Sequence, residues 1–375
     1  MPSTHPVTIV RCGTAQHAAD LAALRLRHRA IPHDYSSWPR HCSVGSWRWC
    51  RIANTKGELI TGFSVHLTNS HALPHTRIGR VEHLGRSLHE EVSDAMGGIL
   101  LEVANRIPRL LRLDVRIFDE DPVRRSRLES SLTAAGWTQL ERQREYTHTV
   151  VLAMGSSEAE VRKSFSTRLR SGMRKALETP LLRYAPIGVE YANRMRELHQ
   201  ATFERTGGSP PRLDARAILR DSSDGQSSKL VGAFATDRGP PEDLVAFAWT
   251  RLHGDYAVLE VTASERSALF RKHISPGFGL MAHLVAWAIE HGALWMDLGG
   301  LPAMDPEPSD PMRGVVEFKT RFSMDFREVA TEWRLEPHPL LARAAAAVRS
   351  IRDSMLGNKH VVESHAKAII TTICR

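Results

Sequence analysis

Apolar and polar positions follow the same order twice along the chain. The first copy covers residues 57–70 and 95–121, and the second covers residues 242–264 and 275–301. In each copy, alternating strand residues lead to a glycine-containing turn, a helix at 3.6-residue spacing and a short apolar strand. Repetition of a whole unit is a stronger signal than any single turn. The pattern predicts an α/β protein built from two copies of one domain.

Domain boundaries follow from this repeat. The first copy ends before residues 146–161, where the pattern begins again. We therefore expect a first domain over residues 1–150, a second over residues 151–330 and a separate segment over residues 331–375. Because the last segment is rich in alanine, it is expected to be helical and to pack back on a domain.

Each copy has glycines near the start of its helix, Gly97 and Gly98 in the first and Gly277 and Gly279 in the second. At a helix N-terminus, backbone N–H groups and the positive end of the helix dipole attract an anion, and glycines let a phosphate approach. The second loop, with Phe278 between its glycines, is therefore a candidate phosphate site. Alternatively, these glycines only supply the positive φ that turns require.

Residues 166–178 are predicted to form an amphipathic helix with a basic outer face. Its apolar stripe consists of Phe165, Leu169, Met173 and Leu177. The opposite side carries four basic residues, Arg168, Arg170, Arg174 and Lys175. Such a face is either a solvated helix surface or a grip for phosphate groups.

The composition limits the classes of partner. The chain has 375 residues, 42% of them hydrophobic, and a formal net charge of +8. These values describe a globular protein and favour anionic partners such as nucleic acid, phosphorylated metabolites or acidic lipid. The cysteines and histidines follow no metal-ligand spacing, and no apolar run reaches the roughly 20 residues of a membrane-spanning helix. A cytoplasmic protein without a metal is expected.

Four segments in the second half of the chain carry a resemblance to a known family. They lie at residues 146–178, 197–208, 275–300 and 314–326. In this order they resemble the Fem family of aminoacyl-tRNA-dependent transferases, whose members add amino acids to the peptide of cell-wall precursors. The resemblance implies two tandem GNAT-like domains, similar to acyl-CoA N-acyltransferases, each with a mixed central sheet and flanking helices.

The resemblance also implies roles for particular residues. The basic helix, from Arg168 to Lys175, would contact tRNA. An aspartate followed by glycines closes the strand of the second domain and corresponds to Asp297. A Phe-Lys pair, expected near the reacting ester, corresponds to Phe318 and Lys319. The long helical-hairpin arm of many cell-wall members has no counterpart in this sequence.

Aminoacyl transfer needs a neutral amine, an activated ester, stabilisation of the oxyanion that forms, and a proton for the departing ribose oxygen. It needs no metal and no cofactor besides the aminoacyl-tRNA co-substrate. Lys319 is a candidate stabiliser of the oxyanion, and the alternative is an exposed lysine on a strand. Asp297 would orient the donor or act as a general base, and the alternative is a structural cap of its strand.

Two further basic clusters have weaker claims to function. Arg40 and Arg48 lie among aromatic residues near the N-terminus and are candidate contacts to the acceptor. Trp47 and Trp49 share a period of two, which is typical of a strand that fills the core. A second cluster lies further along the chain and consists of Arg124, Arg125 and Arg127. It either binds phosphate or balances the charge of the neighbouring acidic residues.

Three functions are compatible with these observations. The leading one is an aminoacyltransferase that moves an amino acid from charged tRNA to an amine on a peptidyl, peptidoglycan-precursor-like acceptor or on a small metabolite, forming an amide or peptide bond. The second is an N-acyltransferase that uses acyl-CoA and holds the CoA diphosphate at Pro276 to Gly279. The third is a noncatalytic protein that binds nucleic acid through its basic face.

Overall fold

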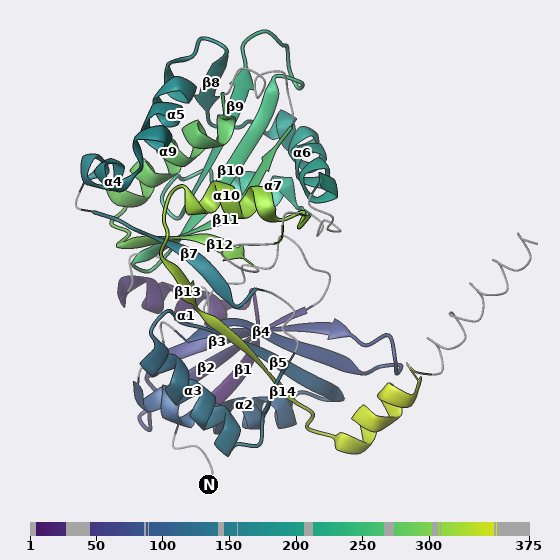
Figure 1. The fold of residues 1–375 in the computed structure, drawn as a ribbon. Coiled ribbons are helices and arrows are strands. Elements are labelled where there is room, and N and C mark those ends of the chain that lie inside the picture. Colours follow the sequence, from purple (N-terminus) through teal and green to yellow (C-terminus); the bar gives the residue numbers. More distant parts are fainter. Residues whose placement is uncertain are drawn as a thin grey trace, which may run out of the picture.

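The structure is a computed structural model, and it describes residues 5–27, 46–85, 90–141, 146–155, 157–205, 213–265, 274–301 and 309–348, with positions 88, 307 and 350. Within these residues, the strands form two sheets of seven strands each (Figure 1). Both sheets contain antiparallel and parallel pairs, and helices flank them. The expected α/β class with mixed central sheets is confirmed.

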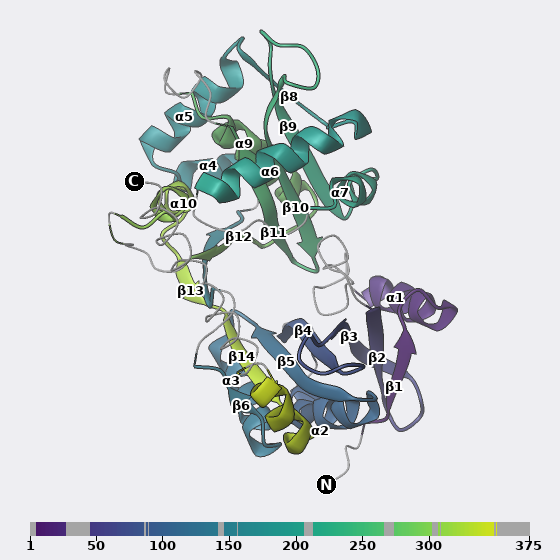
Figure 2. The same ribbon diagram turned by 90° about the vertical axis from the view of Figure 1, so that its right-hand side faces the viewer.

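The first sheet has the strand order β1-β2-β3-β4-β5-β14-β6. Its strands are β1 (Val7–Arg11), β2 (Ser46–Ala53), β3 (Leu59–Asn69), β4 (Arg77–Gly85), β5 (Leu110–Phe118), β14 (Ala330–Leu335) and β6 (Thr138–Gln139). Its helices are α1 (Ala15–Arg27), α2 (Glu90–Arg106) and α3 (Pro122–Ala134). The buried side chains of α2 and α3 pack against the apolar positions of this sheet and form its core (Figure 2).

The second sheet has the strand order β13-β7-β12-β11-β10-β9-β8. Its strands are β13 (Phe326–Glu328), β7 (His148–Ala153), β12 (Trp295–Leu301), β11 (Tyr256–Ser264), β10 (Leu244–His253), β9 (Ser228–Ala235) and β8 (Leu182–Ala185). Helices α4 (Glu158–Ser164), α5 (Thr167–Glu178) and α9 (Pro276–Glu290) contribute to one core. The short helix η2 (Val189–Tyr191), α6 (Ala192–Arg205) and α7 (Ala215–Asp221) contribute to another. Helix α10 (Arg313–Thr320) follows β12.

The repeat seen in the sequence is a repeat of structure. In the first sheet, β3 and β4 pair antiparallel, α2 follows, and β5 returns parallel to β4. In the second sheet, β10, β11, α9 and β12 repeat the same order and the same pair directions. Helix α9 begins after Ser275 with Pro276 at its first position, and Gly292, with φ of 75°, follows its end. Proline and glycine thus mark the two ends of α9, as is usual for helices.

The glycines of the first copy do not lie where the sequence analysis expects them. Gly97 and Gly98 fall in the middle of α2, because this helix already begins at Glu90. A Cβ on Gly97 would overlap the backbone of Ser131 in α3, and the Gly97 N–H donates to Ser131 Oγ at 2.9 Å. Gly97 therefore permits the close packing of two helices, and neither Gly97 nor Gly98 lies in a loop at the start of a helix.

The chain returns to the first sheet near its C-terminus. Strand β13 forms the edge of the second sheet, and after one residue β14 pairs antiparallel with β5 of the first sheet (Figure 1). The crossing residue, Val329, is 1% exposed. It lies in an apolar cluster that joins the two sheets and contains Phe118, Val151, Tyr256, Val258, Trp295, Val329 and Ala330.

The segment over residues 331–375 therefore begins differently from the expectation. Residues 330–335 form a strand, and Trp333 is buried in the first core. These residues are extended because β14 pairs antiparallel with β5 and with β6, which are distant in the sequence. Residues 339–348 are helical, as expected, and residues 351–375 lie outside the described residues.

Arg125 fixes the crossing of the chain to the start of α3. It is 8% exposed, and its guanidinium donates to the carbonyl oxygens of Asp119 (2.9 Å) and Glu328 (2.8 Å) and pairs with the Glu328 carboxylate (3.0 Å). Neighbouring Arg124 forms two hydrogen bonds with the buried Asp119 carboxylate, at 2.9 and 3.0 Å. For Arg124 the structure thus shows local charge balance, whereas Arg125 pairs with a carboxylate that is distant in the sequence.

We predict that Arg125→Met lowers the free energy of unfolding by about 2–4 kcal/mol, because it leaves the carbonyl oxygens of buried Asp119 and of Glu328 without their donor. Urea denaturation measures this change. Arg168→Met is the matched control, since Arg168 is exposed, and a change within about 0.5 kcal/mol is expected there. Equal losses in the two variants would contradict the assignment of Arg125 as a link between the sheets.

Candidate functional site

The two copies of the repeat differ at the end of their parallel strands. In the first sheet, β4 and β5 stay paired as far as Gly85 and Phe118. In the second sheet, β11 and β12 pair only from Tyr256 and Trp295 to Val258 and Asp297, although both strands continue. Ligands of α/β sheets bind where neighbouring strands part at their carboxyl ends. The parting of β11 and β12 therefore defines the candidate site.

Asp297 lies at the point where the strands part and is 3% exposed. Its carboxylate accepts hydrogen bonds from the Thr149 hydroxyl and from the Gly299 N–H, the latter at 2.6 Å. The pairing of β12 with β7 shifts between Asp297 and Gly300. Gly299 has φ of 87°, a conformation that residues with a Cβ rarely adopt. Asp297 and Gly299 thus hold a fixed turn in the strand, which we call the Asp297 turn (residues 297–300).

Lys319 reaches the same turn from α10. Its Nζ donates to the carbonyl oxygen of Gly300 at 3.1 Å, and a Cβ on Gly299 would lie 3.0 Å from Nζ. Glycine at position 299 therefore leaves room for the ammonium group. Lys319 lies on a helix and is half-buried, so the alternative of an exposed lysine on a strand is wrong.

Burial controls the protonation of both groups. Burial lowers the pKa of Lys319 from 10.5 to about 8, and the charge of Asp297 opposes this shift. Burial likewise raises the pKa of Asp297, whereas hydrogen bonds from Thr149 and Gly299 and the charges of Lys319 and Arg116 lower it. The sequence-predicted pair, Asp297 and Lys319, is therefore brought together and electrostatically coupled.

Glu260 is a site residue that the sequence analysis missed. It lies on β11 at a bulge, because Trp249 pairs with Val261 while Thr250 pairs with Leu259. Bulges re-aim side chains and are frequent beside active sites. Glu260 is in hydrogen-bond contact with buried His253 at 3.3 Å. A single acid inside the apolar strand is the signal that could have identified it.

The surroundings of Glu260 favour its neutral form. Burial raises the pKa of Glu260 well above the ordinary value, against the lowering effect of the Arg251 charge, and the Asp297 charge raises it further. Burial also lowers the pKa of Arg251. A carboxyl group with a raised pKa and a lysine with a lowered pKa can both exchange protons near neutral pH.

The first domain contributes Arg116 to the same region. This residue of β5 is 6% exposed, and its guanidinium donates to the carbonyl oxygen of Tyr146 at 2.9 Å. Its charge lowers the pKa of Asp297 across the two sheets. Tyr146 itself packs against Gly300, because a Cβ on Gly300 would lie 2.8 Å from Tyr146 Cβ. The Asp297 turn thus faces both domains.

Phe318 and the glycine loop of α9 form an aromatic cluster. The Phe318 ring stacks on the Phe278 ring with centroids 5.9 Å apart, and a Cβ on Gly277 would lie 3.1 Å from Phe318 Cε2. A Cβ on Gly279 would overlap the ring of Tyr184. These glycines therefore admit aromatic side chains, and Phe318 covers the start of α9 beside Lys319.

The basic helix has the predicted faces. In α5, Leu169 and Met173 are buried, as is Phe165 immediately before the helix, and Leu177 is half-buried. The four basic residues, Arg168, Arg170, Arg174 and Lys175, are exposed. Helix α5 packs on α9, and a Cβ on Gly172 would lie 2.9 Å from the Phe278 ring. Helix α5 thus contacts the aromatic cluster through Gly172, whereas Arg170 and Arg174, each two residues from Gly172, project from the opposite side of the helix.

The candidate acceptor residues are not brought to this site by any described contact. Arg40 lies outside the described residues. Arg48 lies on β2, where its guanidinium donates to the Trp47 carbonyl oxygen at 3.1 Å. Trp49 is fully buried, as its strand pattern predicts, and Trp47 stacks on His66 with ring centroids 4.4 Å apart.

Comparisons with known proteins agree with this architecture. Residues 163–319 match the family model of the acetyltransferase (GNAT) domain. FemX superposes with a TM-score of 0.68 at 14% identity, covering 89% of this chain and 98% of that one. L-PGS from Bacillus licheniformis gives a TM-score of 0.48 at 12% identity, covering 89% and 96%. No curated protein matches the sequence.

The chain therefore has the GNAT fold, and residues 163–319 match the GNAT family model. The fold of FemX extends over both halves of the chain, so the expected resemblance to the Fem family, with tandem GNAT-like domains, is confirmed at the level of the fold. In the described part of the chain, no helix is long and apolar enough to cross a membrane.

We predict that Lys319 titrates near pH 8, below its ordinary value of 10.5, because its ammonium group is desolvated. Carbon-13 NMR of the reductively methylated protein measures each lysine separately, and Lys319→Arg identifies the signal. In the unfolded chain Lys319 titrates near its ordinary value of 10.5.

The shift has a consequence for stability. Between about pH 8 and 10.5 the unfolded chain binds the additional proton, so the stability of the wild type relative to Lys319→Met rises with pH over this window. A Lys319 signal that titrates near pH 10.5 in the folded protein would contradict the described environment.

Proposed function

We propose that this protein is an aminoacyltransferase that moves an amino acid from charged tRNA to an amine on a peptidyl acceptor, such as a peptidoglycan precursor, or on a small metabolite. The observation that carries the proposal is the half-buried Lys319, held by the Gly300 carbonyl at the Asp297 turn, where β11 and β12 part. The FemX-like fold supports this assignment.

The residues suit the steps of aminoacyl transfer. The amine nitrogen attacks the ester carbonyl carbon, a C–N bond forms, and negative charge develops on the carbonyl oxygen. The Lys319 ammonium stabilises this charge, and the Asp297 turn positions Lys319. The C–O bond to the ribose then breaks, the ribose oxygen takes a proton, and the amine loses one. Glu260, which burial keeps in its neutral form, is the candidate donor of the proton that the ribose oxygen takes, and its carboxylate then accepts the proton that the amine nitrogen loses.

Two observations support RNA as the carrier of the acyl group. The exposed basic residues of α5 suit a polyanionic backbone. The competing acyl-CoA reading places a diphosphate at Pro276 to Gly279, where Phe318 covers Gly277 and Phe278 lies within the aromatic cluster. Because aromatic rings lie where the diphosphate would bind, we favour tRNA as the donor. Acyl-CoA is the alternative donor.

We predict that Lys319→Met lowers the rate of transfer about 100- to 1000-fold, because a preorganised donor to the oxyanion is lost. The protonated form of Lys319 is the active one, and the pKa of Lys319 is about 8. The contribution of Lys319 to the wild-type rate therefore falls as the pH rises above 8. Lys319→Arg retains charge at higher pH and moves this decline upward. The assay uses a tRNA pool charged with labelled amino acids and a host small-molecule extract.

Ribonuclease treatment and Lys56→Met serve as controls in the same assay. The proposal requires that label enters a stable amide only with intact tRNA, and that Lys56→Met leaves transfer unchanged. Acylation of the extract supported by acyl-CoA alone would favour the alternative donor. RNA binding without transfer, indifferent to Lys319→Met, would indicate a noncatalytic protein.

A further inference from the structure

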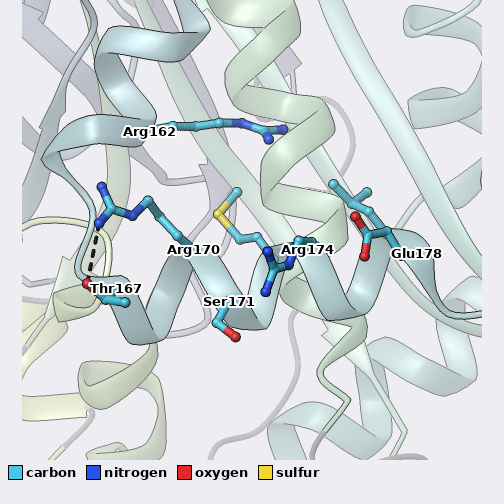
Figure 3. Close-up of a pocket in the computed structure, with 8 residues that line it drawn as sticks. Arg162, Thr167, Arg170, Ser171, Arg174 and Glu178 are labelled. Atoms are coloured by element: carbon cyan, nitrogen blue, oxygen red, sulfur yellow. Dashed lines mark hydrogen bonds between the residues drawn. The ribbon is translucent and has the colours of Figure 1, made fainter.

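A pocket of about 480 Å³ lies on the outer side of α5, near its contact with α4. Figure 3 shows Arg162 extending from α4 on one side, with Arg170, Ser171 and Arg174 along α5. Three guanidinium groups therefore surround one concave surface. The basic stretch of the sequence does not identify Arg162 as part of this pocket, because Arg162 lies on α4, the short helix before α5.

The guanidinium groups of this pocket are only partly used within the protein. In the described part of the chain, Arg174 makes no ion pair or side-chain hydrogen bond. Arg170 makes two long bonds, to Thr167 Oγ1 at 3.3 Å and to the Lys163 carbonyl oxygen at 3.5 Å. Arg162 pairs with Glu158 at 2.6 Å, yet its buried Nε meets no partner among the described residues. The guanidinium groups of Arg170 and Arg174 are thus the donors most available to an anion.

The floor and the far end of the pocket have a different chemistry. Met173 and Leu177 line it with apolar surface. Glu178, one helical turn beyond Arg174, adds a carboxylate at one end and makes no described ion pair of its own. A ligand that fits these features has an anionic group, a flat apolar part and a hydrogen-bond donor. A nucleotide combines a phosphate, a stacking base and, in most bases, an exocyclic amine.

We propose that this pocket binds one unpaired nucleotide of the donor RNA. Its phosphate lies against Arg170, Arg174 and Arg162, and its base lies on the apolar floor. The pocket volume falls in the range of about 300–1,000 Å³ that is typical of small-ligand sites. The inference rests on the proposed function, and it names the part of the donor that the basic helix binds.

The pocket and the aromatic cluster lie on opposite sides of α5. Gly172, on α5, lies against Phe278, and Phe278 stacks on Phe318, which precedes Lys319. Arg170 and Arg174 are each two residues from Gly172 and project from the other side of the helix, so a strand of RNA bound in the pocket reaches the lysine by passing around α5. The basic face also divides into two groups, since Arg168 and Lys175 lie outside the pocket lining.

This division supplies matched variants for binding experiments. The probes are a fluorescein-labelled single-stranded RNA and an uncharged tRNA pool, each titrated over a series of salt concentrations. Arg170→Gln with Arg174→Gln should weaken binding at least tenfold and reduce the slope of log K against log salt by about 1.4, or about 0.7 for each lost contact to a single strand. Arg168→Gln and Lys175→Gln should change the slope by less than half as much.

Substitutions in the apolar floor of the pocket test recognition of the base separately from recognition of the phosphate. Leu177→Ala should lower affinity several-fold and leave the salt slope unchanged, because stacking carries no net charge. CMP and AMP should displace the labelled RNA at lower concentrations than inorganic phosphate does. Thermal denaturation of each variant establishes that these surface substitutions preserve the fold.

Three outcomes would overturn the inference. Equal slope changes for Arg168→Gln and Arg170→Gln would mean a diffuse basic surface. Displacement by phosphate as effective as by CMP and AMP would mean an anion site without a base. Stronger displacement by CoA than by RNA, with a raised KM for acyl-CoA in Arg174→Gln, would assign the nucleotide to CoA. Failure of Lys319→Met to reduce transfer would refute the proposed function while leaving the binding result intact.

Discussion

The burial of Asp297 beside the Lys319 ammonium is the constraint on which the rest of the site depends. Neither charge is stable inside a protein without compensation. The compensation comes from the Thr149 hydroxyl and the Gly299 N–H on the carboxylate, and from the Gly300 carbonyl oxygen on the lysine. These bonds require the Asp297 turn, and the turn requires glycine at position 299. The same turn ends the pairing of β11 with β12. The hydrogen bonds that stabilise the two charges and the parting of the two strands therefore both depend on the Asp297 turn.

The two halves of the chain illustrate how one fold yields a site only where its strands part. The first half keeps β4 and β5 paired to their ends and uses Gly97 for helix packing. In the second half, β11 and β12 part after Asp297, and Glu260 lies at a bulge in the pairing of β11 with β10. The first domain contributes to the site through β5, whose Arg116 acts electrostatically on Asp297.

Periodicity predicted the repeat and the faces of α5, because burial imposes those patterns directly on the sequence. The proximity of Asp297 and Lys319 came from a family resemblance, since the two residues lie on different elements and no spacing rule connects them. Glu260 was missed because its role depends on a bulge in the pairing with β10. The strand over residues 330–335 was missed because pairing with β5 decides its conformation, and that contact spans more than 200 residues.

The most direct test of the central claim is a crystal structure with an aminoacylated RNA fragment whose ester is replaced by a stable amide. The account predicts that the aminoacyl carbonyl oxygen lies about 3 Å from Lys319 Nζ, at a usual hydrogen-bond distance, beside the Asp297 turn. An analogue bound elsewhere, with Lys319 still donating only to Gly300, would contradict the assignment of this turn as the site of transfer.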